Sequence, residues 1–226
     1  MAARARRAAG MIPLSLPSRG GGGLRLLVLG AHSDDIEIGC GGTVLRLVED
    51  GLAASVAWVV ASAGGERADE ARASAEAFCA KAPEHEVVVG DFRDGFLPYQ
   101  GWEVKSFFEE LKRFRPDVVL THRRDDAHQD HRLVGELTWN TFRDHLVLEY
   151  EIPKYDGDLG QPNVFVALDR ARCERKIELL MAGFRSQRER RWFTEDTFWS
   201  ILRLRGLESN SPTTYAEAFH ARKLVM

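Results

Sequence analysis

Short apolar runs alternate with longer helix-favouring stretches through the first 145 residues of this chain. The apolar runs are typical of buried strands and occupy residues 24–30, 54–61, 86–89 and 117–121. Between them, helix-favouring residues fill the stretches 44–50, 66–82 and 101–114. Strands that alternate with helices in this way build βαβ units, whose strands pair in a parallel sheet. The sequence therefore predicts an α/β fold.

The remaining residues follow a less regular pattern. Strands are predicted at 147–152 and 163–168, helices at 173–181 and 194–204, and the stretch 216–226 fits either a helix or a strand. No internal repeat or interdomain linker is recognisable, and 226 residues suit one domain. We expect a single domain over residues 24–226, preceded over residues 1–23 by a disordered leader rich in basic residues and glycine.

Composition narrows the class of protein. The formal net charge is −3 and basic residues are scattered among acidic ones, which argues against a nucleic-acid-binding surface. No stretch approaches the ~18 apolar residues of a membrane-spanning helix. Cys40, Cys79 and Cys173 are too few and too widely spaced for a disulfide framework, so we expect reduced core thiols. These features predict a cytoplasmic protein, and they are compatible with a homo-oligomer.

Two polar tetrads follow predicted strands: His32-Ser33-Asp34-Asp35 and His128-Gln129-Asp130-His131. Because open α/β sheets gather their ligands at the carboxyl ends of parallel strands, the two tetrads should lie together. Two imidazoles and one carboxylate that converge on a point suit a zinc ion with one open position, as catalytic zinc requires. Ferrous iron and cobalt accept the same ligands. The pair of tetrads therefore predicts a metal-dependent hydrolase.

The spacing within the first tetrad suggests separate roles for its acidic residues. Three residues separate His32 from Asp35, so a tight turn at a helix start directs both side chains to one point. Asp34 then points elsewhere, where a free carboxylate beside an activated water can act as general base.

In the second tetrad, His131 is the candidate third ligand, and His128 lies one turn nearer the helix start. From there His128 could hydrogen-bond the oxyanion that develops on a scissile carbonyl. Asp130 is a candidate for fixing the tautomer of one of these imidazoles, and Asp126 is a weaker candidate for similar work.

Simpler interpretations compete with these. A single tetrad could be no more than a helix-capping turn, but two of them at strand ends favour a metal site. The stretch Gly39–Gly42 lies too far beyond its strand for a dinucleotide fingerprint, and we expect it to allow close packing of a helix on the sheet. The other histidines are expected at the surface or the core edge, with the role of the second left open: His85, His122, His145 and His220.

The segments Gly30–Asp35, Gly39–Thr43 and Asp126–Arg132 together resemble the LmbE/PIG-L family of zinc-dependent N-deacetylases, over roughly residues 24 to 145. The resemblance implies a Rossmann-like, mostly parallel sheet flanked by helices. It also implies the removal of acetyl groups from N-acetylglucosaminyl substrates or the cleavage of related amides. The roles that it implies are His32, Asp35 and His131 as metal ligands, Asp34 as general base, His128 as oxyanion stabiliser and Asp130 as the residue that tunes His128.

Two further positions, Ser33 and Arg67, can be compared with the residues that are usual in the family. Ser33 stands where the family usually has proline, which would fix φ near −65°; serine softens the turn but removes no functional group. Arg67 falls where family members often place a substrate-binding arginine, although it could equally be a solvated residue in the first turn of a helix.

We therefore expect a Zn²⁺-dependent hydrolase, with Fe²⁺ or another divalent metal as alternatives, that deacetylates an N-acetylated sugar or sugar conjugate. Cleavage of another amide, such as a thiol conjugate, is one alternative. A metal-binding subunit without catalysis is the other, although such a subunit would not need Asp34 and His128.

The stretch Glu149–Asp158 is expected to form a rim that helps to select the substrate, because it follows a predicted strand. Tyr150 and Tyr155 would offer ring faces to sugars, and Lys154, Asp156 and Asp158 would meet hydroxyl groups. An ordinary surface connection is the alternative.

Overall fold

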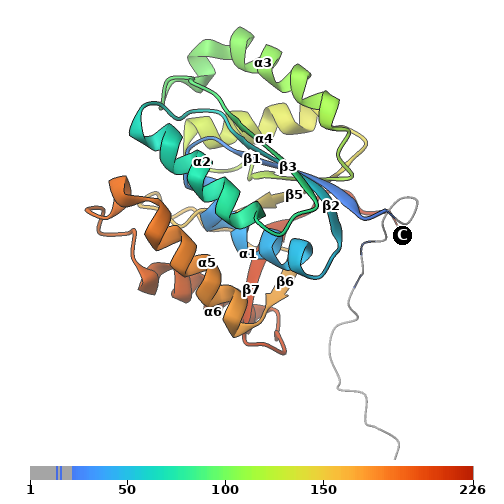
Figure 1. Ribbon diagram of the computed structural model, residues 1–226, viewed down its shortest axis with the longest axis vertical. Helices are drawn as coiled ribbons and strands as arrows, with labels where there is room; N and C mark the ends of the chain where they lie inside the picture. Colours follow the sequence, from blue (N-terminus) through green and yellow to red (C-terminus); the bar gives the residue numbers. More distant parts are fainter. Residues whose placement is uncertain (1–13, 15, 17–21, 226) are drawn as a thin grey trace, which may run out of the picture.

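Seven strands form one twisted sheet in the order β3-β2-β1-β4-β5-β7-β6 in the computed structural model (Figure 1), which describes residues 14, 16 and 22–225. The predicted leader, residues 1–23, lies almost entirely outside the described residues. The strands are β1 (Leu24–Gly30), β2 (Ala53–Val60), β3 (Glu84–Val89), β4 (Val118–His122), β5 (Leu146–Tyr150), β6 (Val164–Leu168) and β7 (Tyr215–His220).

The first five strands are parallel, and the last two run antiparallel to their neighbours. Parallel pairing joins β3 to β2, β2 to β1, β1 to β4 and β4 to β5. Strand β7 pairs antiparallel with both β5 and β6. The chain therefore folds as a single α/β domain on a mostly parallel sheet, as the alternation of apolar and helical segments predicts.

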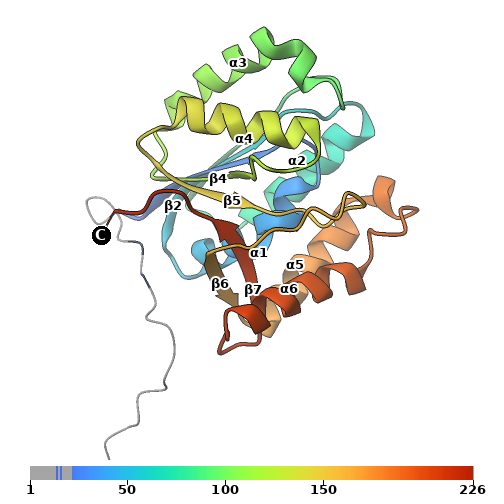
Figure 2. The ribbon, with the colours of Figure 1, turned by 180° about the vertical axis from the view of Figure 1, so that it is seen from behind.

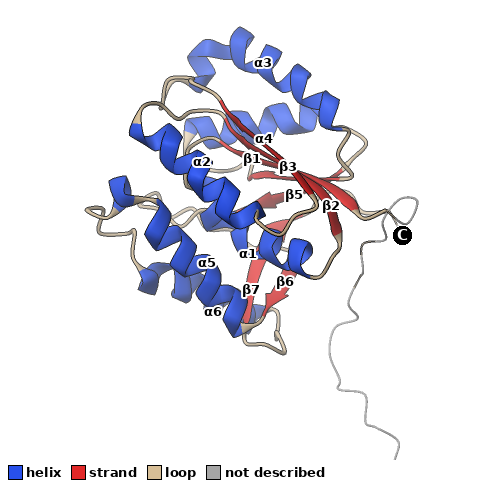
Figure 3. Cartoon of the chain, viewed as in Figure 1, coloured by secondary structure: helices blue, strands red, loops and turns tan. Residues whose placement is uncertain are grey.

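Helices cover both faces of the sheet, as Figure 3 shows by colour. The α-helices are α1 (Asp35–Glu49), α2 (Glu66–Cys79), α3 (Gly101–Glu110), α4 (Gln129–Thr141), α5 (Arg170–Gly183) and α6 (Glu195–Glu208). Short 3₁₀ turns occur at η2 (Leu97–Gln100), η3 (Leu111–Phe114) and η4 (Arg185–Gln187). Figures 1 and 2 place α3 and α4 on one face, and α1, α5 and α6 on the other.

The alternation of side chains along β1 explains why the hydrophobic core has two layers, one on each face of the sheet. Successive strand side chains point to opposite faces. Leu26 and Val28 belong to the core under α1, α2, α5 and α6, whereas Leu27 and Leu29 belong to the core under α3 and α4. All four are at most 2% exposed, so the strand is buried on both faces, as central parallel strands are.

Helix α1 begins at Asp35, well before the stretch 44–50 for which the sequence predicts a helix, so the run Gly39–Gly42 lies inside it. A Cβ built on Gly39 would stand 2.2 Å from the Tyr150 ring, and one on Gly41 would stand 2.6 Å from Phe78. Glycine is therefore required for α1 to approach these rings. This confirms the packing interpretation of the glycine run.

In the second half of the chain, the structure settles the element that the sequence leaves undecided. The ambiguous stretch at 216–226 contributes strand β7, and the predicted helices at 173–181 and 194–204 correspond to α5 and α6. All three cysteines are free and buried, as expected. Among the described residues, no helix is long and apolar enough to cross a membrane.

Candidate metal and catalytic site

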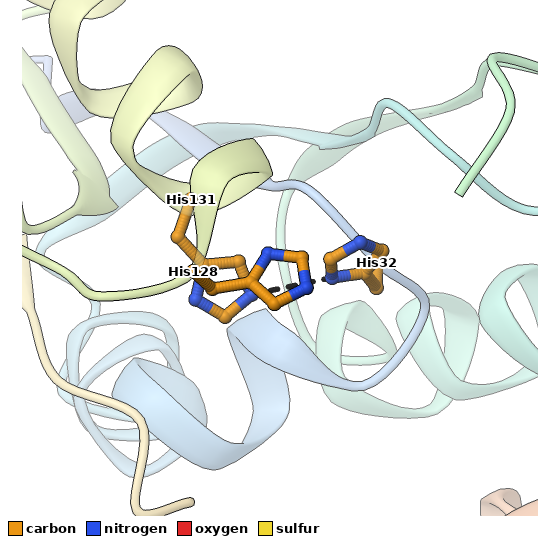
Figure 4. A group of neighbouring side chains, drawn as sticks. All are labelled: His32, His128 and His131. Carbon is orange, nitrogen blue, oxygen red and sulfur yellow. Dashed lines mark hydrogen bonds between the residues drawn. The ribbon is translucent and has the colours of Figure 1, made fainter. Parts of the chain in front are cut away.

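The two tetrads meet because β1 and β4 are parallel neighbours. His32 lies in the loop that follows β1, and Asp35 is the first residue of α1. His128 is the N-cap of α4 and His131 lies in its first turn. Figure 4 shows that the imidazole from the loop after β1 lies beside the two imidazoles from the start of α4.

His32, Asp35 and His131 approach one another closely. The Nδ1 atom of His32 lies 3.2 Å from Nε2 of His131 and 3.4 Å from Oδ2 of Asp35. The other oxygen of Asp35 lies 3.4 Å from Nε2 of His131. All three residues are at most 8% exposed. The structure thus brings together the three side chains that sequence reasoning selects as ligands.

A buried carboxylate lies behind His131. Oδ2 of Asp126 is 3.2 Å from Nδ1 of His131, the ring nitrogen that faces away from His32. Lys154 in turn places its Nζ atom 3.0 Å from the same oxygen of Asp126 and 2.7 Å from Oδ1 of Asp158. Burial lowers the pKa of His131, but Asp35 and Asp126 outweigh that effect and raise it to about 9. Asp126, the weaker candidate from sequence, therefore has the position of a carboxylate that orients a ligand imidazole.

The family resemblance implies that Asp130 tunes His128. In the structure, the carboxylate of Asp130 contacts His32 instead. Its Oδ2 atom is 3.2 Å from Nε2 of His32 and accepts the Gly95 backbone N–H at 2.7 Å. Asp94, which sequence reasoning missed, places Oδ1 3.1 Å from the same His32 nitrogen. No local pattern marks Asp94, because it is brought to the site by the loop that follows β3.

His122 belongs to the site and is fully buried, so it is neither a surface nor a core-edge histidine. Its Nε2 atom accepts the Ala31 backbone N–H at 3.0 Å and lies 3.0 Å from Oδ2 of Asp35. Its ring stacks on that of His131, with centroids 3.9 Å apart. Burial and the charge of His131 lower the pKa of His122 to about 4. The signal for this position was available, since His122 ends the strand before the second tetrad.

The tautomer of His128 follows from its capping role. Its Nδ1 atom accepts the Asp130 backbone N–H at 3.3 Å, which leaves the ring proton on Nε2. Burial and the charges of His131 and His32 lower the pKa of His128, which favours the neutral ring. A neutral imidazole in this tautomer presents one N–H donor away from the helix start.

Asp34 is 5% exposed and faces Arg67. The Arg67 guanidinium donates from Nε to Oγ of Ser33 at 2.9 Å, and its Nη2 lies 3.3 Å from Oδ1 of Asp34. Burial, with the neighbouring charge of Asp35, raises the pKa of Asp34 to about 6. Ser33, which departs from the family pattern, thus supplies an acceptor that proline could not. Arg67 is positioned by the site and is not a freely solvated residue.

The expected rim is shorter than the sequence suggests. Glu149 and Tyr150 belong to β5 and are buried, so the expectation that Tyr150 offers a ring face to sugars is wrong. The ring of Tyr150 packs where Gly39 leaves room, and its hydroxyl donates to the Leu29 carbonyl at 2.6 Å. Because β5 is parallel to β4, the loop after it does emerge at the edge of the tetrads.

Tyr155 and Asp156 lie at the exposed tip of that loop. Tyr155 is 72% exposed, and neither residue makes a hydrogen bond or an ion pair with another described residue. The neighbouring Lys154 instead donates to both Asp158 and Asp126.

Comparison with known proteins identifies the family of this chain. The family model for GlcNAc-PI de-N-acetylases, PIG-L, matches residues 27–142, more than half of the 226 residues. The chain therefore belongs to the PIG-L family of de-N-acetylases. An Escherichia coli K12 protein described as the uncharacterized deacetylase YaiS is 30% identical over 142 residues, which are 57% of this chain and 74% of that protein.

Solved structures share the fold at lower identity. The N,N'-diacetylchitobiose deacetylase of Pyrococcus horikoshii superposes with a TM-score of 0.68 at 20% identity, over 87% of this chain and 83% of that one. The 4-carboxy-2-hydroxymuconate hydratase of Pseudomonas putida KT2440 superposes with a TM-score of 0.69 at 18% identity, over 89% and 97%. Since these two enzymes are named for different reactions, the shared fold alone does not fix the chemistry.

Proposed function

We propose that this chain is a divalent-metal-dependent hydrolase that removes the acetyl group from an N-acetylated sugar or sugar conjugate. The observation that carries the proposal is the mutual approach of His32, Asp35 and His131, with the buried carboxylate of Asp34 beside them. Membership of a deacetylase family supports the reaction class.

The donor set fits a metal ion. Ligand atoms at about 2.0–2.1 Å from a tetrahedral zinc ion stand roughly 3.3–3.4 Å apart. The two ring nitrogens of His32 and His131 are 3.2 Å apart, and each lies 3.4 Å from a different oxygen of the Asp35 carboxylate. The carboxylate of Asp126 behind His131 adds the outer partner that ligand imidazoles usually have. Zn²⁺ suits this set best, and Fe²⁺ or another divalent metal accepts the same ligands.

A cation held by these residues would polarise the acetyl carbonyl and make a nearby water more acidic. Asp34 removes a proton from the attacking water, and its raised pKa places it near the range in which a carboxylate can both accept and return a proton. The protonated Asp34 then protonates the leaving amine, so that acetate and a free amino sugar result.

His128 contributes a hydrogen bond to the oxyanion. Its Nδ1 atom is occupied by the Asp130 backbone N–H, so the Nε2–H group is the available donor. Asp130 fixes this geometry through its backbone and, through its side chain, holds the ring of His32.

Arg67, Tyr155 and Asp156 are proposed to bind the sugar. Arg67 offers a guanidinium that is 31% exposed and anchored on Ser33 and Asp34. Tyr155 and Asp156 stand free at the tip of the loop at the same edge of the sheet. Replacing both with alanine should raise KM or change substrate preference while the metal content stays unchanged. Equal kinetics across a substrate panel would reduce this loop to a plain connection.

The test of the function uses the whole chain, stripped of metal by a chelator and then reloaded with Zn²⁺ or Fe²⁺. Acetate release is measured with N-acetylated monosaccharides, nucleotide sugars and glycolipid head groups, beside N-acyl thiol conjugates as the alternative amides. We expect release from at least one N-acetylated sugar that vanishes on metal removal and returns on reloading. Activity that survives complete removal of metal contradicts the proposal, as does turnover of thiol-conjugate amides alone.

A further inference from the structure

A hollow of about 430 Å³ lies beside the C-terminal half of α4, and we call it the basic hollow. Its lining includes Arg124, Glu136, Trp139, Arg143, Arg222 and Lys223. Four of these residues are cationic and one is acidic, although the whole chain has a net charge of −3. Trp139 lies two turns beyond His131 on α4, about 12 Å along the helix axis. None of the site residues that the structure describes lines the basic hollow, so it is separate from the candidate site.

The indole of Trp139 gathers three of the cations. Its Nε1–H group donates to the carboxylate of the buried Glu149, which fixes the ring. The guanidinium carbons of Arg124 and Arg222 lie 5.7 and 4.9 Å from the ring centroid, and Nζ of Lys223 lies 5.5 Å from it. A cation at such a distance is attracted to an aromatic ring. Three like charges therefore surround one side chain.

Hydrogen bonds fix the chain segments that carry these cations. The Ala221 backbone donates to Oδ1 of Asn163 at 2.8 Å and accepts from its Nδ2 at 3.0 Å. The Lys223 ammonium donates to the Arg143 carbonyl, and Nε of Arg143 donates to the Asn140 carbonyl at 3.2 Å. Figure 2 shows the end of the chain running from β7 toward the loop between α4 and β5. The end of the chain is thus tied to the C-terminal end of α4.

Three of the cations that line the basic hollow lack an acidic partner. Arg124 pairs with Glu149, at 3.2 Å. Arg143, Arg222 and Lys223 form no ion pair with any residue that the structure describes. Like charges that face one hollow repel one another, and an anion placed among them turns this repulsion into attraction.

We propose that the basic hollow binds a small molecule that carries a phosphate group, held by Arg143, Arg222 and Lys223. A guanidinium fork matches two phosphate oxygens, and the lysine adds a point charge. Glu136 offsets one of the three unpaired charges, so a phosphate monoester, with about two negative charges, balances the rest. The volume of about 430 Å³ lies in the range of small-molecule sites.

The surroundings favour a small ligand over a nucleic acid. The adjoining hollow shares Asn140 and Arg143 with the basic hollow, and its lining includes Glu109 and Asp144. These carboxylates would repel the backbone phosphates of a strand that continued beyond Arg143. The inference does not depend on the proposed function, because the two sites share no residue.

The experiment measures binding to the zinc-loaded full chain by isothermal titration calorimetry, with inorganic phosphate and adenosine monophosphate as probes. We expect one molecule bound per chain, and a Kd that rises about tenfold or more in the double variant Arg143→Gln/Arg222→Gln. Arg190→Gln/Arg191→Gln is the matched control, because it removes two exposed arginines that have no ion-pair partner among the described residues. The control should bind as the parent chain does.

Removal of the metal by a chelator should leave the Kd unchanged, because the candidate metal ligands do not line the basic hollow. Tighter binding of adenosine monophosphate than of phosphate supports a phosphate ester as the ligand, and equal binding supports the phosphate ion. If acetate release fails with every substrate but this binding persists, the proposed function is wrong and the phosphate site stands.

An unchanged Kd in Arg143→Gln/Arg222→Gln, or an equal loss in the control, overturns the phosphate site. Binding that disappears with the metal also overturns it and places the probe at the candidate metal site. Tighter binding of a single-stranded DNA oligonucleotide than of adenosine monophosphate would overturn it as well and assign the cations to a nucleic acid.

Discussion

Asp34 and Asp35 are neighbours in sequence, yet their surroundings shift their pKa values in opposite directions. Both are buried, which disfavours the charged form of each. Asp35 faces His131, His122 and His32, and these imidazoles hold its pKa well below the usual value. For Asp34, burial and the charge of Asp35 outweigh the favourable charges of Arg67 and His32, and its pKa rises to about 6. A pair of carboxylates separated in this way can divide the tasks of ligand and base.

The ligand role of Asp35 is tested by Asp35→Ala. Removing this carboxylate takes away one of three donors and the partner of His122, so metal content per chain should fall from near one to a small fraction. Metal analysis after gel filtration measures this, with Asp156→Ala as an acidic control from the exposed loop. Full occupancy of the Asp35→Ala protein would assign the ligands elsewhere.

The base role of Asp34 is tested by Asp34→Asn. Amide and carboxylate are nearly isosteric, so the metal content should stay unchanged while proton abstraction fails. General base catalysis contributes about 10²–10⁴-fold, and kcat for acetate release should fall by that order. A variant within a few-fold of the parent enzyme would show that another group removes the proton.

At the scale of elements, the position of α1 depends on glycines that the helix would otherwise disfavour. Gly39 allows the Tyr150 ring to lie against the helix, and Gly42 makes room for Leu168 and Glu217. Glu217 also accepts the Gly42 and Thr43 N–H groups at 2.8 and 2.6 Å, and pairs with the buried Lys176 at 2.7 Å. Since α1 starts at Asp35, this packing also fixes the orientation of a candidate ligand.

Gly39→Ala should destabilise the fold by about 1–3 kcal/mol, because the new methyl group overlaps a fully buried ring that cannot move away. Gly101→Ala is the matched control: it lies in a helix and has no other atom within 4 Å of an added Cβ. That variant should be neutral or more stable by about 0.4–1 kcal/mol. Urea unfolding measures both, and equal midpoints for the two variants would contradict the packing argument.

Across the whole molecule, the core sequesters every thiol. Burial raises the pKa of Cys79 and of Cys173 to about 12 each, and that of Cys40 well above its usual value. Since the thiolate is the reactive form, none of them should react with iodoacetamide at pH 8 in the folded protein.

Mass spectrometry should therefore show no alkylation of the native chain, and alkylation at all three cysteines after unfolding in urea. Modification of Cys40 without denaturant would mean that α1 opens readily from the sheet.

The sequence by itself determines the α/β class, the parallel strands and the meeting of the two tetrads. These features follow from local patterns: apolar runs of strand length, helix-favouring stretches between them, and His and Asp placed directly after two strands. The interpretation of Gly39–Gly42 as a packing feature also follows, because the spacing from the strand excludes a dinucleotide loop.

Only the tertiary structure decides which side chains complete the site. Asp94 carries no motif of its own and reaches His32 through the course of a loop. His122 ends a predicted strand, but its contact with Asp35 follows from the pairing of β4 with β1. Asp130 contacts His32 because the turn at Gly95 binds its carboxylate, and Tyr150 is buried because α1 packs over β5. Such contacts join residues far apart in the chain, so they depend on how helices and strands pack and not on the spacing of residues within any one segment.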